Sequence, residues 1–209
     1  MLHLFDYHRS SAAFRVRLAL NYKCLSYAKI PVNLLAGEQS QSNYLNLNPA
    51  GLVPTLQTGQ NFLQQSLAII EYLEEYCPQP ALLPQSPIER AYVRAIALSI
   101  ACDIHPLNNL RVLNYLRTNL QQTEDEVGSW YRHWISVGLT SLEQQISTSQ
   151  FYSGEFVFGT QFTLADLCLL PQLVSARRFQ GTLDSYPTLL KIEAHCRQYE
   201  WVNLAYPTN

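Results

Sequence analysis

The stretch "YHRSSAAFRVRLAL", Tyr7–Leu20, decides how the first half of the chain folds. It follows the segment Leu2–Tyr7, which alternates in part between apolar and polar residues and predicts a short strand. From Ser11 onward apolar residues recur at helical spacing, so the stretch predicts a turn followed by a helix. The turn carries, in order, Arg9, Ser10, Ser11 and Ala12. It therefore offers a cation and two hydroxyls at a helix N-terminus, without a nucleophile of its own.

The elements that follow predict a small α/β domain. Ser26–Val32 is typical of a second strand, and Pro54–Leu56 with Asn61–Leu63 indicates a hairpin around a Thr-Gly turn. A helix after it has apolar residues on one face and glutamates on the other. Two strands around a helix, a hairpin and a closing helix predict a thioredoxin-like domain over residues 1–80.

The second half is predicted to be all-helical. Four prolines in the eleven residues Cys77–Pro87 end the first domain, and we place a linker at residues 81–87. Strand signals then almost vanish, and a helical domain is expected over residues 88–209. Helices are predicted at Ile88–Leu120, with a kink at Pro106, and at Glu124–Thr148, Leu164–Phe179 and Thr188–Tyr199. The third opens with the capping-box pattern Thr163-Leu164-Ala165-Asp166.

Composition narrows the classes of function. A net charge of −2 over 209 residues argues against nucleic acid or an anionic membrane as partner. The N-terminal residues have no signal-peptide pattern, and no stretch approaches the ~20 apolar residues of a spanning helix. The five cysteines are scattered and never spaced CxxC, which favours reduced thiols and a cytoplasmic location over disulfides or a metal site.

Two polar pairs lie where helices of the first domain begin. A redox thioredoxin carries CxxC after its first strand, but Ser10 and Ser11 occupy that place, so dithiol exchange is excluded there. These hydroxyls can instead donate hydrogen bonds to a thiolate from another molecule. Gln65 and Ser66 open a helix whose N-terminus favours a carboxylate. The alternative for both pairs is ordinary N-capping.

The helical half has two further polar groups. His105, Asn108, Asn109 and Arg111 surround Pro106 in an otherwise apolar pattern and indicate a polar pocket, the alternative being structural side chains. Arg177 and Arg178 end a helix, where cations are favoured in any case.

Taken together, these stretches resemble the zeta class of glutathione transferases, the class with maleylacetoacetate isomerase activity. "RSSAAFRVRLAL" resembles the class signature of Ser-Ser-Cys followed by an Arg-x-Arg helix, with Ala12 in the place of the cysteine. "LNPAGLVPTL", "QSLAIIEYLEE", "DIHPLNN", "TLADLCLLPQ" and "ARRF" follow in the family's order. The resemblance implies the glutathione transferase fold, glutathione as cofactor, a dicarboxylate substrate and a homodimer. It also implies cis–trans isomerisation by reversible thiolate addition.

The resemblance assigns roles residue by residue. Ser10 and Ser11 match the residues that meet the glutathione sulfur, and which of them does so is left open. Gln65 and Ser66 match the pair at the γ-glutamyl end. Val53 matches the backbone clamp on the cysteinyl part; it precedes a proline that is cis in the family, although X-Pro bonds are cis in only about 5% of cases. Further glutathione or substrate contacts are implied for Gln39, His105, Asn109 and Arg111. Arg178 matches a carboxylate-binding arginine, and the cations implied to hold a dianionic substrate are Arg9, His105, Arg111 and Arg178.

Three other functions compete with this prediction. Maleylpyruvate isomerase uses the same chemistry, and "IHPLNN" followed by an arginine also resembles that branch. A general glutathione transferase or peroxidase is a second alternative. A non-catalytic binding module is the third, but such a module has no use for either the Ser10–Ser11 or the Gln65–Ser66 pair.

Overall fold

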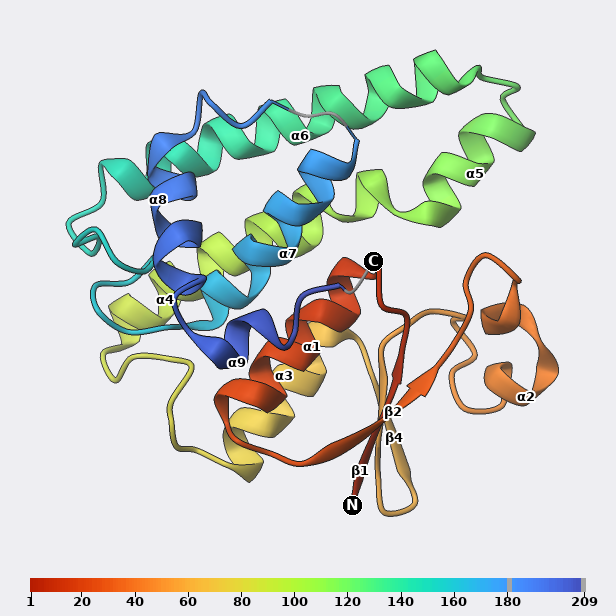
Figure 1. The fold of residues 1–209 in the computed structure, drawn as a ribbon, viewed down its shortest axis with the longest axis horizontal. Coiled ribbons are helices and arrows are strands. Elements are labelled where there is room, and N and C mark those ends of the chain that lie inside the picture. The colour runs from red at the N-terminus through yellow and green to blue at the C-terminus, as the bar shows by residue number, and fades with distance from the viewer. Residues whose placement is uncertain (180–181, 208–209) are drawn as a thin grey trace. The chain divides into compact units, whose positions relative to one another are not determined.

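A computed structural model describes residues 1–179 and 182–207 of the chain (Figure 1). It contains two compact units. The first comprises Met1–Ala81 and the C-terminal segment from Arg197, and the second is Leu82–Cys196. The sequence-based boundaries 1–80 and 88–209 stay a prediction. The units differ from them at the C-terminal end, because the segment from Arg197 packs with the first unit.

The first unit is built on a four-stranded sheet. Its strands are β1 (Leu2–Asp6), β2 (Tyr27–Pro31), β3 (Thr55–Thr58) and β4 (Asn61–Gln64), in the order β2-β1-β3-β4 (Figure 1). β1 pairs with β2 in parallel and with β3 antiparallel, and β3 pairs antiparallel with β4. The predicted strands are all present, and their pairing confirms the thioredoxin-like arrangement.

Helices pack on both sides of this sheet. α1 (Ser11–Tyr22) and α3 (Ser66–Tyr76) lie against each other on one side, and the apolar residues Phe14, Leu18 and Leu73 are buried there (Figure 1). The 3₁₀ turn Glu38–Ser40 and α2 (Ser42–Leu45) lie on the other side (Figure 1). A small apolar cluster centred on Val32, Tyr44 and Val53 forms a second core beneath α2.

The C-terminal segment is tied to α1. α9 (Glu200–Asn203) lies beside that helix, where Asn21 Nδ2 donates to the carbonyl of Trp201 at 3.0 Å. The ring of Tyr206 meets Phe14 edge-on, with the centroids 4.9 Å apart. The predicted helix Thr188–Tyr199 therefore ends earlier, at Cys196, and the chain beyond it belongs to the first unit.

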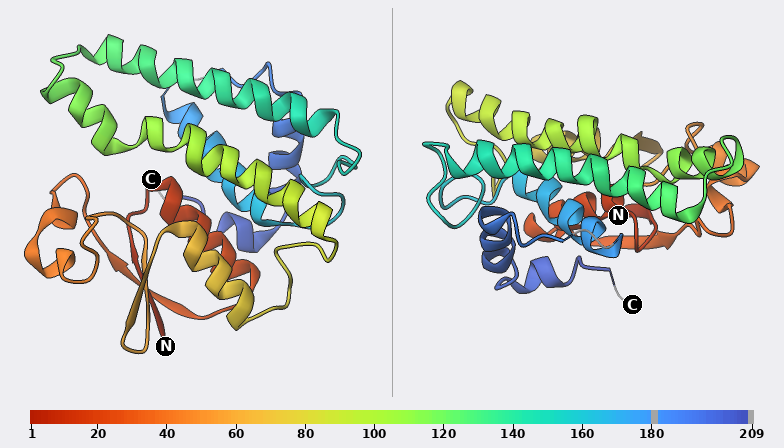
Figure 2. Two further views of the ribbon diagram at one scale, coloured as in Figure 1. Left: turned by 180° about the vertical axis from the view of Figure 1, so that it is seen from behind. Right: turned by 90° about the horizontal axis from the view of Figure 1, so that it is seen from above.

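The second unit consists of helices, as predicted. Its main helices are α4 (Pro87–Leu98), α5 (Leu110–Thr118), α6 (Glu124–Ser147), α7 (Leu164–Arg178) and α8 (Pro187–Cys196). α7 packs against α4, and α6 packs against α8 (Figures 1 and 2). Residues 164–173 of α7 are all buried, so this helix forms the centre of the unit. Among the helices of the described residues, none is long and apolar enough to cross a membrane.

The predicted single helix Ile88–Leu120 is wrong. α4 ends at Leu98 and continues as a π-helical turn, Ser99–Ile104, in which His105 N donates to the carbonyl of Ile100. A 3₁₀ turn beginning at Pro106 follows, and α5 starts only after Asn109. Proline has no N–H for the helical ladder, and here the predicted kink is a complete break.

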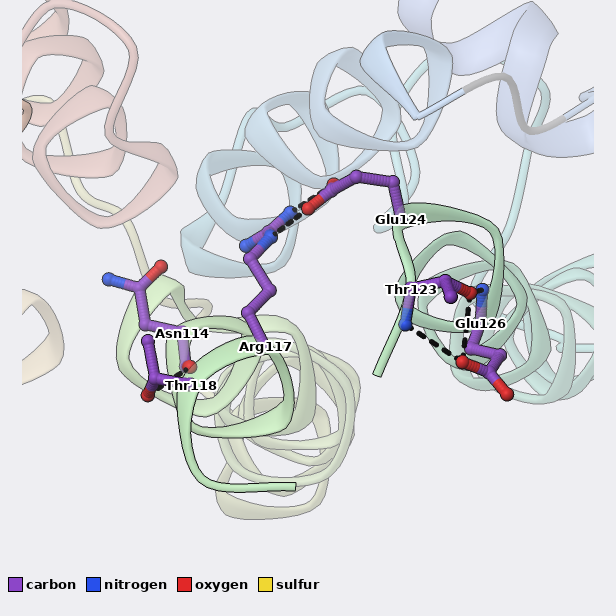
Figure 3. Close-up of polar contacts among 6 residues, drawn as sticks. All are labelled: Asn114, Arg117, Thr118, Thr123, Glu124 and Glu126. Atoms are coloured by element: carbon purple, nitrogen blue, oxygen red, sulfur yellow. Dashed lines mark hydrogen bonds and ion pairs between the residues drawn. The ribbon is translucent and has the colours of Figure 1, made fainter. Parts of the chain in front are cut away.

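Polar contacts fix the connection between α5 and α6. Arg117 binds Glu124 with two hydrogen bonds, Nε to Oε1 at 2.6 Å and Nη2 to Oε2 at 2.9 Å (Figure 3). Thr123 and Glu126 form a reciprocal capping box at the start of α6 (Figure 3). The two capping-box hydrogen bonds satisfy backbone N–H groups that the start of a helix leaves unpaired.

A buried carboxylate starts α7. The Asp166 side chain accepts hydrogen bonds from Val157 N at 2.9 Å, Thr163 N at 2.8 Å and Thr163 Oγ1 at 2.9 Å, which confirms the predicted capping pattern. Burial raises the pKa of Asp166 from 3.8 to about 6, and the three hydrogen bonds oppose that rise. The group therefore joins the loop before α7 to the helix itself.

We expect Asp166→Ala to lower the free energy of unfolding by about 2–4 kcal/mol at pH 7.5, because two buried N–H groups lose their acceptor. Since the pKa of Asp166 is raised in the folded protein, between about pH 4 and pH 6 the folded protein holds a proton that the unfolded chain has released. The free energy of unfolding of the wild type should thus fall by roughly 3 kcal/mol relative to that of the variant as the pH rises from about 4 to about 6. Urea unfolding at several pH values measures both, with Thr163→Ser as a control that keeps the hydroxyl. A wild-type advantage that grows with pH would contradict the prediction.

Candidate active site

Three connections of the first unit leave the sheet at the same end. Phe5 of β1 pairs with Thr55 of β3, and Thr55 pairs with Gln64 of β4. The end of β1, the start of β3 and the end of β4 therefore lie side by side. The predicted residues on these connections are Ser10, Ser11, Val53, Gln65 and Ser66. Strand pairing brings together residues that are more than fifty positions apart in the sequence.

Ser10 caps α1. Its Oγ accepts a hydrogen bond from Ala13 N at 3.2 Å, and its own backbone N–H donates to the carbonyl of Tyr7 at 2.8 Å. The capping interpretation is therefore correct for Ser10, but it does not exclude the functional one. The cap uses an acceptor site of the oxygen and leaves the hydroxyl proton available for donation. Ser11 is the first residue of α1, and both serines are half-buried.

A buried arginine on α1 holds the turn that carries these serines. Arg17 Nη1 lies 2.6 Å from Asp6 Oδ1, and the two side chains are 3% and 7% exposed. The same guanidinium donates to the carbonyls of His8 at 3.1 Å and Ala205 at 3.0 Å. Sequence analysis missed this role, although the Arg-x-Arg spacing on an apolar helix is a signal for it. Arg9 lies exposed in the same turn.

The backbone before β3 is held by two residues that sequence analysis also missed. Tyr44 OH and Asn48 Nδ2 both donate to the carbonyl of Leu52 at 2.7 Å. Burial raises the pKa of Tyr44, so its hydroxyl stays a neutral donor. The next peptide bond, Val53-Pro54, is cis, as the family resemblance implied. Val53 itself is buried, which leaves its backbone as the part able to meet a ligand.

Gln39 lies against the same connection. Its carbonyl oxygen is 3.1 Å from the position that a Cβ at residue 51 would occupy, and Gly51 has a φ of +61°. Glycine is required there for both the close approach and the backbone conformation. Within residues 1–179 and 182–207, the buried Oε1 of Gln39 has no hydrogen-bond partner.

Gln65 and Ser66 form the start of α3. Gln65 precedes the helix with a φ of +67°, a conformation that costs energy for a residue with a side chain and that is found at functional sites. Ser66 is buried, and its Oγ accepts a hydrogen bond from Arg15 Nη1 at 3.3 Å. The unpaired N–H groups and the positive end of the helix dipole make this position favourable for an anion.

In the second unit, the predicted residues His105 and Asn109 lie in the break between α4 and α5, and Arg111 lies in the first turn of α5. His105 ends the π-helical turn, and Asn109 caps α5 by accepting a hydrogen bond from Arg111 N at 3.1 Å. Trp130 of α6 donates to the carbonyl of Leu107 at 2.8 Å and so holds this segment. The break thus presents the polar groups that an uninterrupted helix would have spread around its surface.

The structure separates the two arginines at the end of α7. Arg177 forms a two-point ion pair with Glu193 of α8, Nη1 to Oε1 being 2.6 Å, and so has a structural role. Arg178 is exposed at the last residue of the helix. Burial raises the pKa of Tyr131 to about 12, and the positive charge of Arg178 opposes part of that rise. The exposure of Arg178 at the end of α7 is compatible with the carboxylate-binding role that the family resemblance implies.

Comparison with known proteins identifies the family. Residues 1–75 match the family model of the glutathione S-transferase N-terminal domain. A probable maleylacetoacetate isomerase of Vibrio cholerae is 46% identical over 208 residues, which cover 99% of this chain and 95% of that protein. The chain belongs to the zeta class of glutathione transferases. The fold and the family predicted from the sequence are both confirmed.

Two further zeta-class proteins are similar over nearly the whole chain. A maleylpyruvate isomerase of a Ralstonia species is 42% identical, covering 98% of this chain and 96% of that protein. A crystal structure of a maleylacetoacetate isomerase from Methylobacterium extorquens AM1, with malonate and glutathione bound, has a TM-score of 0.95 at 36% identity, and covers 98% and 96% of the two chains. The roles assigned to individual residues of this chain stay predictions.

We expect Arg17→Met to reduce the free energy of unfolding by about 3–5 kcal/mol, because it leaves the buried Asp6 carboxylate unpaired. The matched control is Arg117→Met. That arginine also lies 2.6 Å from its glutamate but in an exposed pair, which contributes about 0–1 kcal/mol. Urea unfolding of both variants tests the difference, and equal losses would contradict it.

Proposed function

We propose that this protein is a glutathione-dependent isomerase that converts maleylacetoacetate to fumarylacetoacetate. The observation that carries the proposal is the convergence of three connections at one end of the sheet. The connection after β1 carries the hydroxyls of Ser10 and Ser11 and no cysteine. The connection before β3 has a backbone held by hydrogen bonds, and the connection after β4 leads into the start of α3, which favours an anion. The zeta-class relatives with this named activity support the assignment.

Glutathione fits the residues at this end of the sheet. Ser66 and the N-terminus of α3 would take the γ-glutamyl carboxylate, with Gln65 beside them. The backbone of Val53 would hold the cysteinyl part, and Gln39, with its unpaired buried oxygen, would supply a further contact. Bound glutathione would supply a thiolate whose addition converts the carbon–carbon double bond to a single bond that can rotate, and whose expulsion restores the double bond and regenerates glutathione.

Ser10 and Ser11 would stabilise that thiolate. A free thiol has a pKa near 8.5 and is mostly protonated at pH 7. A hydrogen bond to a charged group contributes about 1.5–3 kcal/mol, which corresponds to a lowering of the thiol pKa by about one to two. We assign the larger share to Ser10, because the turn held by Arg17 fixes its position and its proton is not used by the cap.

The substrate is a dianion, and the remaining predicted residues are suited to it. Arg178 would bind one carboxylate, while Arg9, His105 and Arg111 would hold the rest of the substrate. Asn109 fixes the first turn of α5, on which Arg111 lies. Cations near the conjugated carbonyl also stabilise the negative charge that develops during the reaction.

The test compares two substrates. Loss of ultraviolet absorbance from maleylacetoacetate and from maleylpyruvate is followed with and without glutathione. We expect turnover only with glutathione and a higher kcat/KM for maleylacetoacetate. A higher value for maleylpyruvate would establish the alternative, which the 42% identity to a maleylpyruvate isomerase supports. Turnover of neither substrate would refute the proposal.

The proposal also includes a homodimer and a cytoplasmic location. Light scattering of the purified protein tests the homodimer.

We predict that Ser10→Ala raises the pKa of the bound thiol by about one to two. The isomerase rate near pH 7 should then fall roughly tenfold or more and recover in part at higher pH. Ser11→Ala is the matched control, because it removes the neighbouring hydroxyl. The pH–rate profile and thiolate absorbance provide the measurement. If neither variant changes the profile, another group stabilises the thiolate.

Arg178→Ala should weaken substrate binding, in contrast to Ser10→Ala, which should raise the thiol pKa. Loss of a charge-assisted hydrogen bond of about 1.5–3 kcal/mol should raise KM for dicarboxylate substrates roughly tenfold to a hundredfold. The thiol pKa should stay unchanged. Arg178→Lys, which keeps the charge, should restore part of the affinity. A changed thiol pKa with an unchanged KM would show that Arg178 acts elsewhere.

A further inference from the structure

Arg15 is a buried cation that the fold leaves without a counter-charge. The residue is 2% exposed and is among the largest fully buried side chains of the described residues. In the part of the chain that the structure describes, its Nη1 donates to Ser66 Oγ, its Nε and Nη2 atoms have no hydrogen-bond partner, and no carboxylate pairs with it. Arg17, two residues further along the same helix, is fully paired with Asp6 and two carbonyls.

Burial of an unpaired guanidinium is unfavourable, because the charge loses its hydration without gaining an anion. Arg15 nevertheless lies buried next to the first residue of α3, where its Nη1 contacts Ser66. That helix has eleven residues, so its N-terminus has a developed positive end. Two independent positive features therefore act on the same point, where an anionic group would offset both.

The hydrogen bond to Ser66 also determines what that serine can do. Its oxygen accepts from Arg15, so the serine proton is directed away from the guanidinium. The acceptor that matches such a proton beside a helix N-terminus is a carboxylate. We propose that Arg15 is a positioning residue for the γ-glutamyl α-carboxylate: it orients the Ser66 hydroxyl as a donor and supplies the balancing positive charge. The proposal rests on glutathione being the cofactor.

The test compares two tripeptides by calorimetry. One is glutathione, and the other is 4-aminobutyryl-Cys-Gly, which lacks only the α-carboxylate. We expect Arg15→Met to raise the Kd for glutathione at least about tenfold and to change the Kd for the second peptide less than about twofold. Arg15→Lys should restore part of the affinity for glutathione. If Arg15 had only a structural role, its replacement would weaken the binding of both peptides equally, and that result would overturn the proposal.

Thermal unfolding without ligand is the second measurement. Because Arg15 is unpaired, its replacement by an apolar side chain of similar length should lower the melting temperature much less than Arg17→Met does. Arg15→Gln repeats the test with a polar side chain. If both neutral variants fail to fold, the guanidinium stabilises the fold itself and the proposal is wrong. If the wild type does not bind glutathione, the proposed cofactor is wrong, a result that the Arg15 variants cannot produce.

Discussion

The ion pair between Arg17 and Asp6 is the constraint on which the first unit depends. Both side chains are almost completely buried, so neither can lose its partner without leaving a dehydrated charge. The pair joins the last residue of β1 to the middle of α1, and the turn with Ser10 lies between them. The same guanidinium binds the carbonyl of Ala205, which brings the C-terminal segment onto α1. One side chain thus fixes a strand end, a helix start and the end of the chain.

The antiparallel pairing of β3 with both of its neighbours brings the segments of the candidate site together. It places the segments before β3 and after β4 next to the turn before α1. Each segment is then held by contacts of its own: Tyr44 and Asn48 hold the carbonyl before Val53, and Arg15 holds Ser66. Rigid placement of this kind lowers the cost of ordering a flexible tripeptide at binding.

The second unit gains its polar groups where helices end or break. α7 is buried along most of its length and has exposed arginines only in its last turn. His105 and Asn109 lie in the break between α4 and α5, and Arg111 follows in the first turn of α5. In both places a helix terminus leaves backbone groups unpaired and side chains outside the core, which suits residues that meet a charged ligand.

Sequence patterns alone were enough to predict most of the helices and strands and the family, and they also supplied the site residues on which the proposed function rests. Hydrophobic periodicity is a local property, so it located α1, α3, α6 and α7 and the four strands. It could not distinguish a kink at Pro106 from a break, because that depends on whether π-helical and 3₁₀ turns find packing partners such as Trp130. Only the tertiary structure showed that, among the residues it describes, a carboxylate pairs with Arg17 and none pairs with Arg15. It alone also showed that Tyr44 and Asn48 hold a carbonyl. The partner of a buried polar group lies across the fold, where strand register and helix packing place it.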